Sequence, residues 1–293
     1  MAGVFEIADG VIDTVAKHHP LSATHMGVPG FDHLMPDYTP EAGEVFHNDV
    51  LAAYKDMQAA EPTNERERMC KDTFIEEISL SIEQYESREH LRDMNVLFSP
   101  VQSVRSIFDL MSQDSAEAWE NIASRMEKIG ESLDGYRRAL DVGRSEGLVT
   151  SIRQVSGTAE QCEVWSGNGD NDPFFDSMIA AFSASDISDD ALARRIENAA
   201  HLATDAYATM GEYLRNEYLP DATTVDGVGR DRYALSAKGY IGAEIDPEET
   251  YDWGWEQLAW VRSEMTKTAE KIKPGASIAE AVELLENDPE KMI

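Results

Sequence analysis

The sequence is poor in basic side chains and in cysteine. Its 293 residues include 25 Lys and Arg against 56 Asp and Glu, which gives a formal net charge of −31, and only 2 Cys. A surface of this charge repels phosphate backbones and anionic lipid headgroups, so we expect neither a nucleic-acid partner nor a membrane partner. Two cysteines cannot form a disulfide framework, and their scarcity favours a reducing compartment.

The sequence also lacks a leader pattern and long apolar runs. Residues 1–9 contain no basic side chain and no uninterrupted apolar core of the length found in signal peptides, so they predict no signal peptide. No stretch reaches the roughly 18 apolar residues of a membrane-spanning helix. Together with the low cysteine content, these features predict a cytoplasmic protein.

Apolar residues recur at helical spacing through almost the whole chain, whereas alternating runs of strand type are scarce. The pattern therefore predicts an all-α fold of long helices, with at most a small β-hairpin near residues 221–245. Gly130, Gly135 and Gly143 argue against one unbroken helix in the region that follows Ser115. Capping residues and prolines predict helices at about residues 4–17, 39–60, 64–85, 99–108, 115–133, 188–219 and 246–272.

We expect a single helical region over residues 1–293. The stretch at 166–173 is rich in Gly, Asn and Asp and ends in Pro, so it is the best candidate for an internal boundary. It would divide the chain into sub-lobes 1–166 and 173–293.

The predicted helix at 246–272 is apolar on two sides. Trp255, Leu258 and Met265 lie along one side, while Trp253 and Trp260 lie two turns apart on another. A helix with two apolar faces is usually buried between neighbouring helices. We therefore expect these tryptophans to pack in a core.

The search for catalytic chemistry gives mostly negative results. None of the 7 histidines is followed by Glu, and no two of them stand three or four residues apart, so the helical zinc signature is absent. Cys70 and Cys162 lie at positions that favour small core residues over nucleophiles. The sequence thus predicts no catalytic residue, no metal ligand and no cofactor for this chain.

Three residues after a glycine-rich turn are the best candidates for substrate binding. Arg230, Arg232 and Tyr233 stand at the start of a predicted helix, where a guanidinium can clamp a carboxylate through two parallel hydrogen bonds. In a chain with a large negative charge, two arginines beside a tyrosine can mark the point that receives an anionic group. A structural salt bridge is the alternative use of the same side chains.

Several separate motifs together resemble one family. In chain order they are PLSATHMG at 20–27, HLRDMN at 90–95, SPVQ at 99–102, FDLM at 108–111, GYR at 135–137, YLP at 218–220, VGRDRY at 228–233 and ETYDWGWE at 249–256. Their order and spacing resemble the amino-terminal half of the DUF885 family of bacterial proteins. The resemblance implies a mostly helical fold akin to that of zinc metallopeptidases.

The family's His-Glu pair and Pro-Gly-His-His motif belong to the carboxy-terminal half, and this chain contains no His-Glu dipeptide. The resemblance therefore implies that zinc would come only with that other half, and that this chain supplies the helical substrate cleft for a peptide-like small substrate. We expect the chain alone to be inactive and to self-associate through exposed apolar surface. The alternative is a non-catalytic helical scaffold or binding protein that retains the shape of the lobe.

Overall fold

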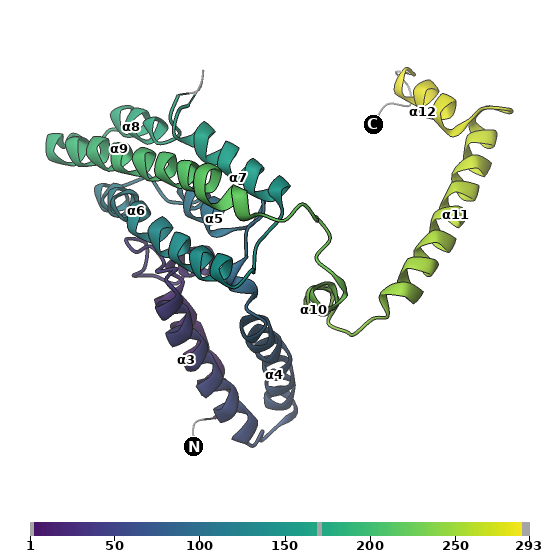
Figure 1. Ribbon diagram of the computed structural model, residues 1–293, viewed down its shortest axis with the longest axis horizontal. Coiled ribbons are helices and arrows are strands. Elements are labelled where there is room, and N and C mark those ends of the chain that lie inside the picture. The colour runs from purple at the N-terminus through teal and green to yellow at the C-terminus, as the bar shows by residue number, and fades with distance from the viewer. Residues whose placement is uncertain (1–2, 169–171, 289–293) are drawn as a thin grey trace. The chain divides into compact units, whose positions relative to one another are not determined.

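The computed structural model describes residues 3–168 and 172–288, and over these residues the protein is all-α, as the sequence predicts (Figure 1). The chain divides into two units, residues 1–227 and 228–293, which we describe separately. Within the described ranges, β-type pairing is limited to an isolated parallel bridge between Ser151 and Thr223. The region in which the sequence allowed a hairpin holds a helix, residues 230–241. No helix in the described part of the chain has the length and apolar character needed to cross a membrane.

The first unit contains a succession of helices, joined by short turns in some places and by longer loops in others, such as that between α2 and α3. Its helices are α1 Val4–His18, α2 Pro20–Met26, α3 Pro40–Ala59, α4 Glu65–Glu86, α5 Pro100–Ser106, α6 Ala116–Ser145, α7 Ile152–Trp165, α8 Asp176–Ser183 and α9 Asp190–Tyr213. A π-turn at Leu214–Tyr218 and a 3₁₀ turn at Leu219–Asp221 extend α9.

The helix starts follow the capping residues that the sequence places there. The Thr39 hydroxyl accepts a hydrogen bond from the backbone N–H of Ala42 at 3.2 Å, and Ser115 does the same for Ala118 at 3.2 Å. Each cap satisfies one of the backbone donors that the first turn of a helix leaves unpaired. The predicted starts of α3 and α6 are therefore confirmed.

The main core of the first unit forms where α6 packs along α9, which also contacts α7 and α8 (Figure 1). Trp119, Ile122 and Met126 of α6 are fully buried there, as their spacing predicts. Tyr207 of α9 is also fully buried, and its hydroxyl donates to the Val101 carbonyl at 2.9 Å. This core holds the ends of α2 and α6 in place, and the cavity described below lies between them.

The helix α6 continues through its three glycines, although their low helix propensity argues against an unbroken helix. A Cβ at Gly143 would collide with the carbonyl oxygen of Leu91 and lie 2.9 Å from that of Leu148. A Cβ at Gly135 would lie 3.1 Å from the backbone nitrogen of Thr39. These two glycines therefore allow other backbone segments to approach α6 closely, and the packing compensates for their low helix propensity.

The stretch at 166–173 does not coincide with the division between the two units, which lies at 227–228. Phe175, just after this stretch, is buried in the same core as Cys162, just before it. The reason is that α7 and α8 both contact α9, so the helices before and after the stretch belong to one core. Part of the stretch, residues 169–171, lies outside the described residues.

Helices α1, α3 and α4 pack on one another and form a smaller cluster (Figure 1). Val4, Met57 and Ala60 are its buried residues, and Cys70 and Phe74 of α4 pack against them. The helix predicted at residues 64–85 therefore packs its apolar side against α1 and α3, although most residues of that side are only half-buried.

The second unit consists of α10 Arg230–Ile241, α11 Pro247–Ile272 and α12 Ile278–Glu286. Asp246 caps α11 by accepting from the backbone N–H of Glu248 at 2.8 Å. The expectation that the α11 tryptophans pack in a core is wrong, because Trp253, Trp255 and Trp260 are 59%, 56% and 61% exposed. In α11 only Ala269 is buried, and α12 is the helix that contacts α11.

Candidate functional site

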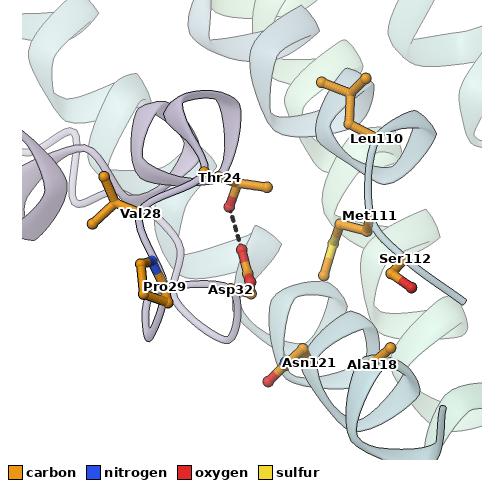
Figure 2. A pocket seen from close by; sticks show the side chains of 10 residues that line it. Thr24, Val28, Pro29, Asp32, Leu110, Met111, Ser112, Ala118 and Asn121 are labelled. Carbon is orange, nitrogen blue, oxygen red and sulfur yellow. Dashed lines mark hydrogen bonds between the residues drawn. The ribbon is translucent and has the colours of Figure 1, made fainter. Parts of the chain in front are cut away.

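A cavity of about 280 Å³ lies in the first unit between the loop that follows α2 and the start of α6 (Figure 2). Thr24 is in the last turn of α2, and Asp32 is in the loop after it. The Thr24 hydroxyl donates to Oδ1 of Asp32 at 2.6 Å, and this hydrogen bond lies at the wall of the cavity. The apolar part of the lining consists of Val28, Pro29, Leu110 and Met111.

The wall of the cavity is held from behind by Arg125, which is fully buried. Its Nη2 donates to Oγ1 of Thr24 at 2.6 Å and to the carbonyl of Pro20 at 3.2 Å. Its Nε donates to the carbonyl of Leu34 at 3.1 Å. The guanidinium thus links α2 and the following loop to α6. Thr24, which accepts from Arg125, in turn donates a hydrogen bond to Asp32.

Burial lowers the pKa of Arg125 to about 10, because water no longer solvates the charged form, and the nearby Asp32 carboxylate opposes this effect. The Nη1 atom of Arg125 is buried and has no hydrogen-bond partner. Since it is shielded from solvent, it does not offer a donor to the cavity. The cavity wall therefore presents the carboxylate of Asp32 and not the guanidinium.

The cavity has limited chemistry. Its polar lining is one carboxylate, Asp32, with Thr24, Ser112 and Asn121, and it contains neither an imidazole nor a thiol. Such a set can bind a small polar group, but it lacks the paired acid and base or the activated nucleophile that catalysis requires.

The structure places the three predicted substrate-binding residues in the second unit, in the first turn of α10. Nη1 of Arg230 donates to Oε1 of Glu248 at 2.7 Å, and its Nη2 lies 3.8 Å from Oδ1 of Asp246. The hydrogen bond to Glu248 raises the pKa of Arg230. Tyr233 is exposed at 48%, and Arg232 is exposed beside it. Arg230 is therefore already paired with a carboxylate of this chain. This is the structural salt bridge that the sequence offered as the alternative use of the side chain.

The histidines are spread over the first unit in different environments. Nε2 of His18 lies 3.1 Å from Oδ2 of Asp49. The ring of Tyr85 is stacked between those of His47 and His90, with centroid separations of 4.1 and 4.2 Å. Within residues 3–168 and 172–288, no three His, Cys, Asp or Glu side chains are arranged to hold a metal ion.

The two cysteines differ in burial. Cys162 is fully buried on α7, and burial raises the pKa of its thiol to about 12. Such a thiol stays protonated and unreactive near neutral pH. Cys70 is half-buried against the small cluster of α1, α3 and α4.

Sequence reasoning missed the cavity and the role of Arg125. A signal for Arg125 was present, because it stands three residues after Ile122 and four before Ile129 on the buried side of its helix. A charged residue at a core-facing position is unusual and is normally paired or hydrogen-bonded. The partners of Arg125 come from residues 20–34, which are 91 to 105 positions away along the chain, and no local pattern reveals contacts over such a separation.

The fold and the sites described above define a helical protein of two units with a long, solvent-exposed aromatic helix. The family model described as "Bacterial protein of unknown function (DUF885)" matches residues 20–293. This chain belongs to the DUF885 family. A search of curated proteins finds no match.

Two solved structures show the same fold. A protein from Colwellia psychrerythraea described as a "putative lipoprotein" matches with a TM-score of 0.75 and 13% identity, over 94% of this chain and 52% of that one. A "putative lipoprotein of unknown function" from Shewanella oneidensis matches with a TM-score of 0.71 and 14% identity, over 98% of this chain and 52% of that one. This chain therefore spans about half the length of each.

Proposed function

We propose that this chain forms the amino-terminal, substrate-cleft part of a DUF885-type, zinc-dependent, peptidase-like hydrolase. The observation that supports the proposal best is the coverage of the two solved proteins. Their fold matches nearly all of this chain, 94% and 98%, but only 52% of each solved protein. A protein of this fold can therefore carry about as much polypeptide again, and that polypeptide would supply the chemistry.

The described residues of this chain do not fit zinc, because they bring no three suitable ligands together. Zinc sites in enzymes use three protein ligands and leave one position open. The metal and the residues that act with it would therefore belong to the other half. The role left for this chain is to bind and orient a peptide-like small substrate.

Within that role, Arg230 would bind a carboxylate of the substrate. Its guanidinium is exposed and already pairs with Glu248 at 2.7 Å, so a substrate carboxylate would replace Glu248 at the same donor. The exposed Tyr233 lies one turn further along α10 and would donate its hydroxyl to the same ligand. Arg232 adds positive charge at this helix start.

The first experiment is to sequence the DNA beyond the coding region and then to co-express any second polypeptide with this chain. We expect a reading frame with His-Glu and Pro-Gly-His-His motifs, and stoichiometric zinc with peptide hydrolysis only when both polypeptides are present. An unrelated sequence downstream, with no activity in any combination, would contradict the enzyme proposal and leave the non-catalytic scaffold. Tight zinc and turnover by this chain alone would show that its metal site had been misread.

The second experiment tests the substrate residues in the active pair. Arg230→Gln should raise KM for a substrate that bears a free carboxylate by at least about tenfold, which corresponds to one lost charge-assisted hydrogen bond. The matched control is Arg153→Gln, which removes another exposed guanidinium paired with a carboxylate, that of Asp226 at 2.8 Å. Equal effects of the two variants would show that general charge, rather than a binding position, is responsible.

The location in the cell stays a separate proposal. The low cysteine content and the first residues of the sequence predict the cytoplasm, whereas both solved proteins are described by the word lipoprotein. Fractionation of the source cells, with a cytoplasmic and an envelope marker, distinguishes the two. Recovery in the envelope fraction would contradict the cytoplasmic prediction.

A further inference from the structure

The cavity beside Asp32 combines one anionic group with an apolar lining. Two segments of the chain build it: the end of α2 with the loop that follows, and the segment that leads into α6 with the first turns of that helix. Figure 2 shows Val28 and Pro29 on one side and Leu110 and Met111 on the other, with Asp32 between them in this view. A ligand in the cavity therefore meets a carboxylate at one point and hydrocarbon on two sides.

The hydrogen bonds at the wall require Asp32 to act as an acceptor. A guanidinium donates and cannot accept, so Thr24 accepts from Nη2 of Arg125 at 2.6 Å. The single proton of the Thr24 hydroxyl then goes to Oδ1 of Asp32 at 2.6 Å rather than to the Pro20 carbonyl at 3.3 Å. An aspartate is ionised near neutral pH, and these hydrogen bonds run in the direction that an ionised carboxylate needs.

One oxygen of this carboxylate is left for a ligand. Among the residues that the structure describes, Oδ2 of Asp32 accepts no hydrogen bond, and the side-chain amide of Asn121 makes none. Ser112 adds a hydroxyl to the lining. The cavity thus offers one charged acceptor and two neutral polar groups. An ammonium group suits this set, because it carries a positive charge and three N–H donors on one atom.

The size of the cavity limits the ligand to a small molecule. Its volume is about 280 Å³, and liquid water occupies about 30 Å³ per molecule. The space therefore holds on the order of ten non-hydrogen atoms. An ammonium group on an unbranched stem of about five carbons fits this volume. The net charge of −31 adds a long-range attraction for a cation.

We propose that this cavity binds a primary ammonium group on a short, unbranched aliphatic stem. The charged head pairs with Oδ2 of Asp32, and the stem lies between the two apolar sides. A ligand carboxylate would be repelled by the like charge of Asp32. A metal ion is disfavoured, because the lining supplies a single carboxylate and the apolar sides offer an ion no ligands. The cavity lies in the first unit and Arg230 in the second, and this proposal does not depend on the hydrolase proposal.

Isothermal titration calorimetry of the full chain with n-pentylamine near neutral pH tests the proposal. Phosphate buffer contains no competing amine, and about 0.15 M KCl screens weak adsorption of cations to the acidic surface. We expect one site per chain with a Kd on the order of 1 mM, as suits a ligand of this size. The alcohol n-pentanol and the anion pentanoate have similar stems, and each should bind at least about tenfold more weakly. Equal binding of the alcohol would show that the charge of Asp32 contributes nothing and would overturn the proposal.

The variant Asp32→Asn removes the charge but keeps an acceptor for Thr24. It should raise the Kd of n-pentylamine at least about tenfold, with a circular dichroism spectrum that matches the parent protein. The matched control is Asp37→Asn in the same loop. The Asp37 carboxylate is exposed, accepts from the backbone N–H of Thr39 at 2.9 Å and lies outside the cavity lining. Its loss should leave the Kd within about twofold. Equal effects of the two variants would show that the overall negative charge attracts the amine, contrary to the proposal.

The variant Leu110→Ser tests the apolar side of the cavity. Leu110 is 59% exposed, so its replacement spares the core. In the parent protein n-pentylamine should bind at least about tenfold more tightly than methylamine, because its stem buries apolar surface. Leu110→Ser should reduce this ratio at least about threefold. Methylamine or K⁺ that binds as tightly as n-pentylamine would mean that the apolar lining has no role, and the proposed ligand would then be wrong.

The same ammonium group can come from a free amine or from the side chain of a lysine in a peptide. Nα-acetyl-lysine amide distinguishes these sources in the same titration. Tighter binding than that of n-pentylamine identifies a lysine side chain as the ligand, and weaker binding identifies a free amine. Both results support an ammonium site, whereas no saturable binding of either compound overturns it.

Discussion

The buried guanidinium of Arg125 offers the clearest test of what stabilises the first unit. Arg125→Met keeps an apolar stem of similar length but removes every donor. The Pro20 and Leu34 carbonyls and the Thr24 hydroxyl then lose the hydrogen bonds that they accept at 3.2, 3.1 and 2.6 Å. Arg125 is fully buried, so water does not easily replace the lost donors.

The expected loss follows from two opposing contributions. A hydrogen bond to a charged donor contributes about 1.5–3 kcal/mol, and contributions to one side chain are not additive. The variant also removes a buried charge whose Nη1 has no partner, and this relieves part of the cost of burying it. We therefore expect a net loss of about 2–3 kcal/mol in the free energy of unfolding, which is a large part of the stability of a typical domain.

Urea unfolding followed by far-UV circular dichroism measures the effect as a lower midpoint, by about 1–2 M for typical slopes. The matched control is Arg138→Met on the same helix, where the arginine is half-exposed and pairs with Glu41 at 2.9 Å. That variant should change stability by less than about 0.5 kcal/mol. Equal midpoints for the two variants would refute the argument that the contacts of Arg125 with residues 20–34 stabilise the unit.

Three further predictions concern other positions in the first unit. Gly143→Ala should lower the free energy of unfolding by at least about 2 kcal/mol, because the new methyl group collides with a backbone carbonyl. Gly130→Ala should raise it by about 0.5–1 kcal/mol, because the nearest atom to the new methyl group, Cβ of Ala206, is 3.8 Å away. Urea unfolding of both variants should show these opposite changes in stability. Iodoacetamide at mildly alkaline pH should label Cys70 before Cys162, whose pKa is raised to about 12, and peptide mass spectrometry should find Cys162 modified only after unfolding. The pKa of His90 is lowered, chiefly by burial. As the pH falls below about 6.5, the unfolded chain therefore binds more protons than the folded one, and the free energy of unfolding decreases. In urea titrations between about pH 7.5 and 5.5, His90→Phe should make this decrease smaller.

The starts of several long helices could be predicted from the sequence because their signals are local, whereas α7, α8 and α12 were not among the predicted ranges. Thr39 with Pro40, Ser115, and Asp246 with Pro247 are helix starts in both the pattern and the structure. The division between the units could not be predicted in this way. The Gly- and Asn-rich stretch at 166–173 has the composition of a linker, but the contacts of α7 and α8 with α9 show that the helices before and after it share one core.

The two candidate sites differ in how far apart along the chain their contacting residues lie. The salt bridge of Arg230 with Glu248 joins residues only 18 positions apart; the sequence offered a structural salt bridge as the alternative use of Arg230 but did not identify its partner. The contacts of Arg125 reach 91 to 105 positions along the chain. No periodicity or motif connects such positions, so the cavity wall could be found only in the folded structure.

By itself, the sequence determined that this protein is helical, acidic and a member of the DUF885 family, because helical spacing, charge and short motifs are properties of the chain in one dimension. Only the tertiary structure decided which apolar stripes are covered. The stripes of α6 and α11 look alike in the sequence, yet Trp119 is fully buried while Trp255 is 56% exposed. A residue is buried only when another segment packs against it, and the sequence of one helix does not say which segment that is.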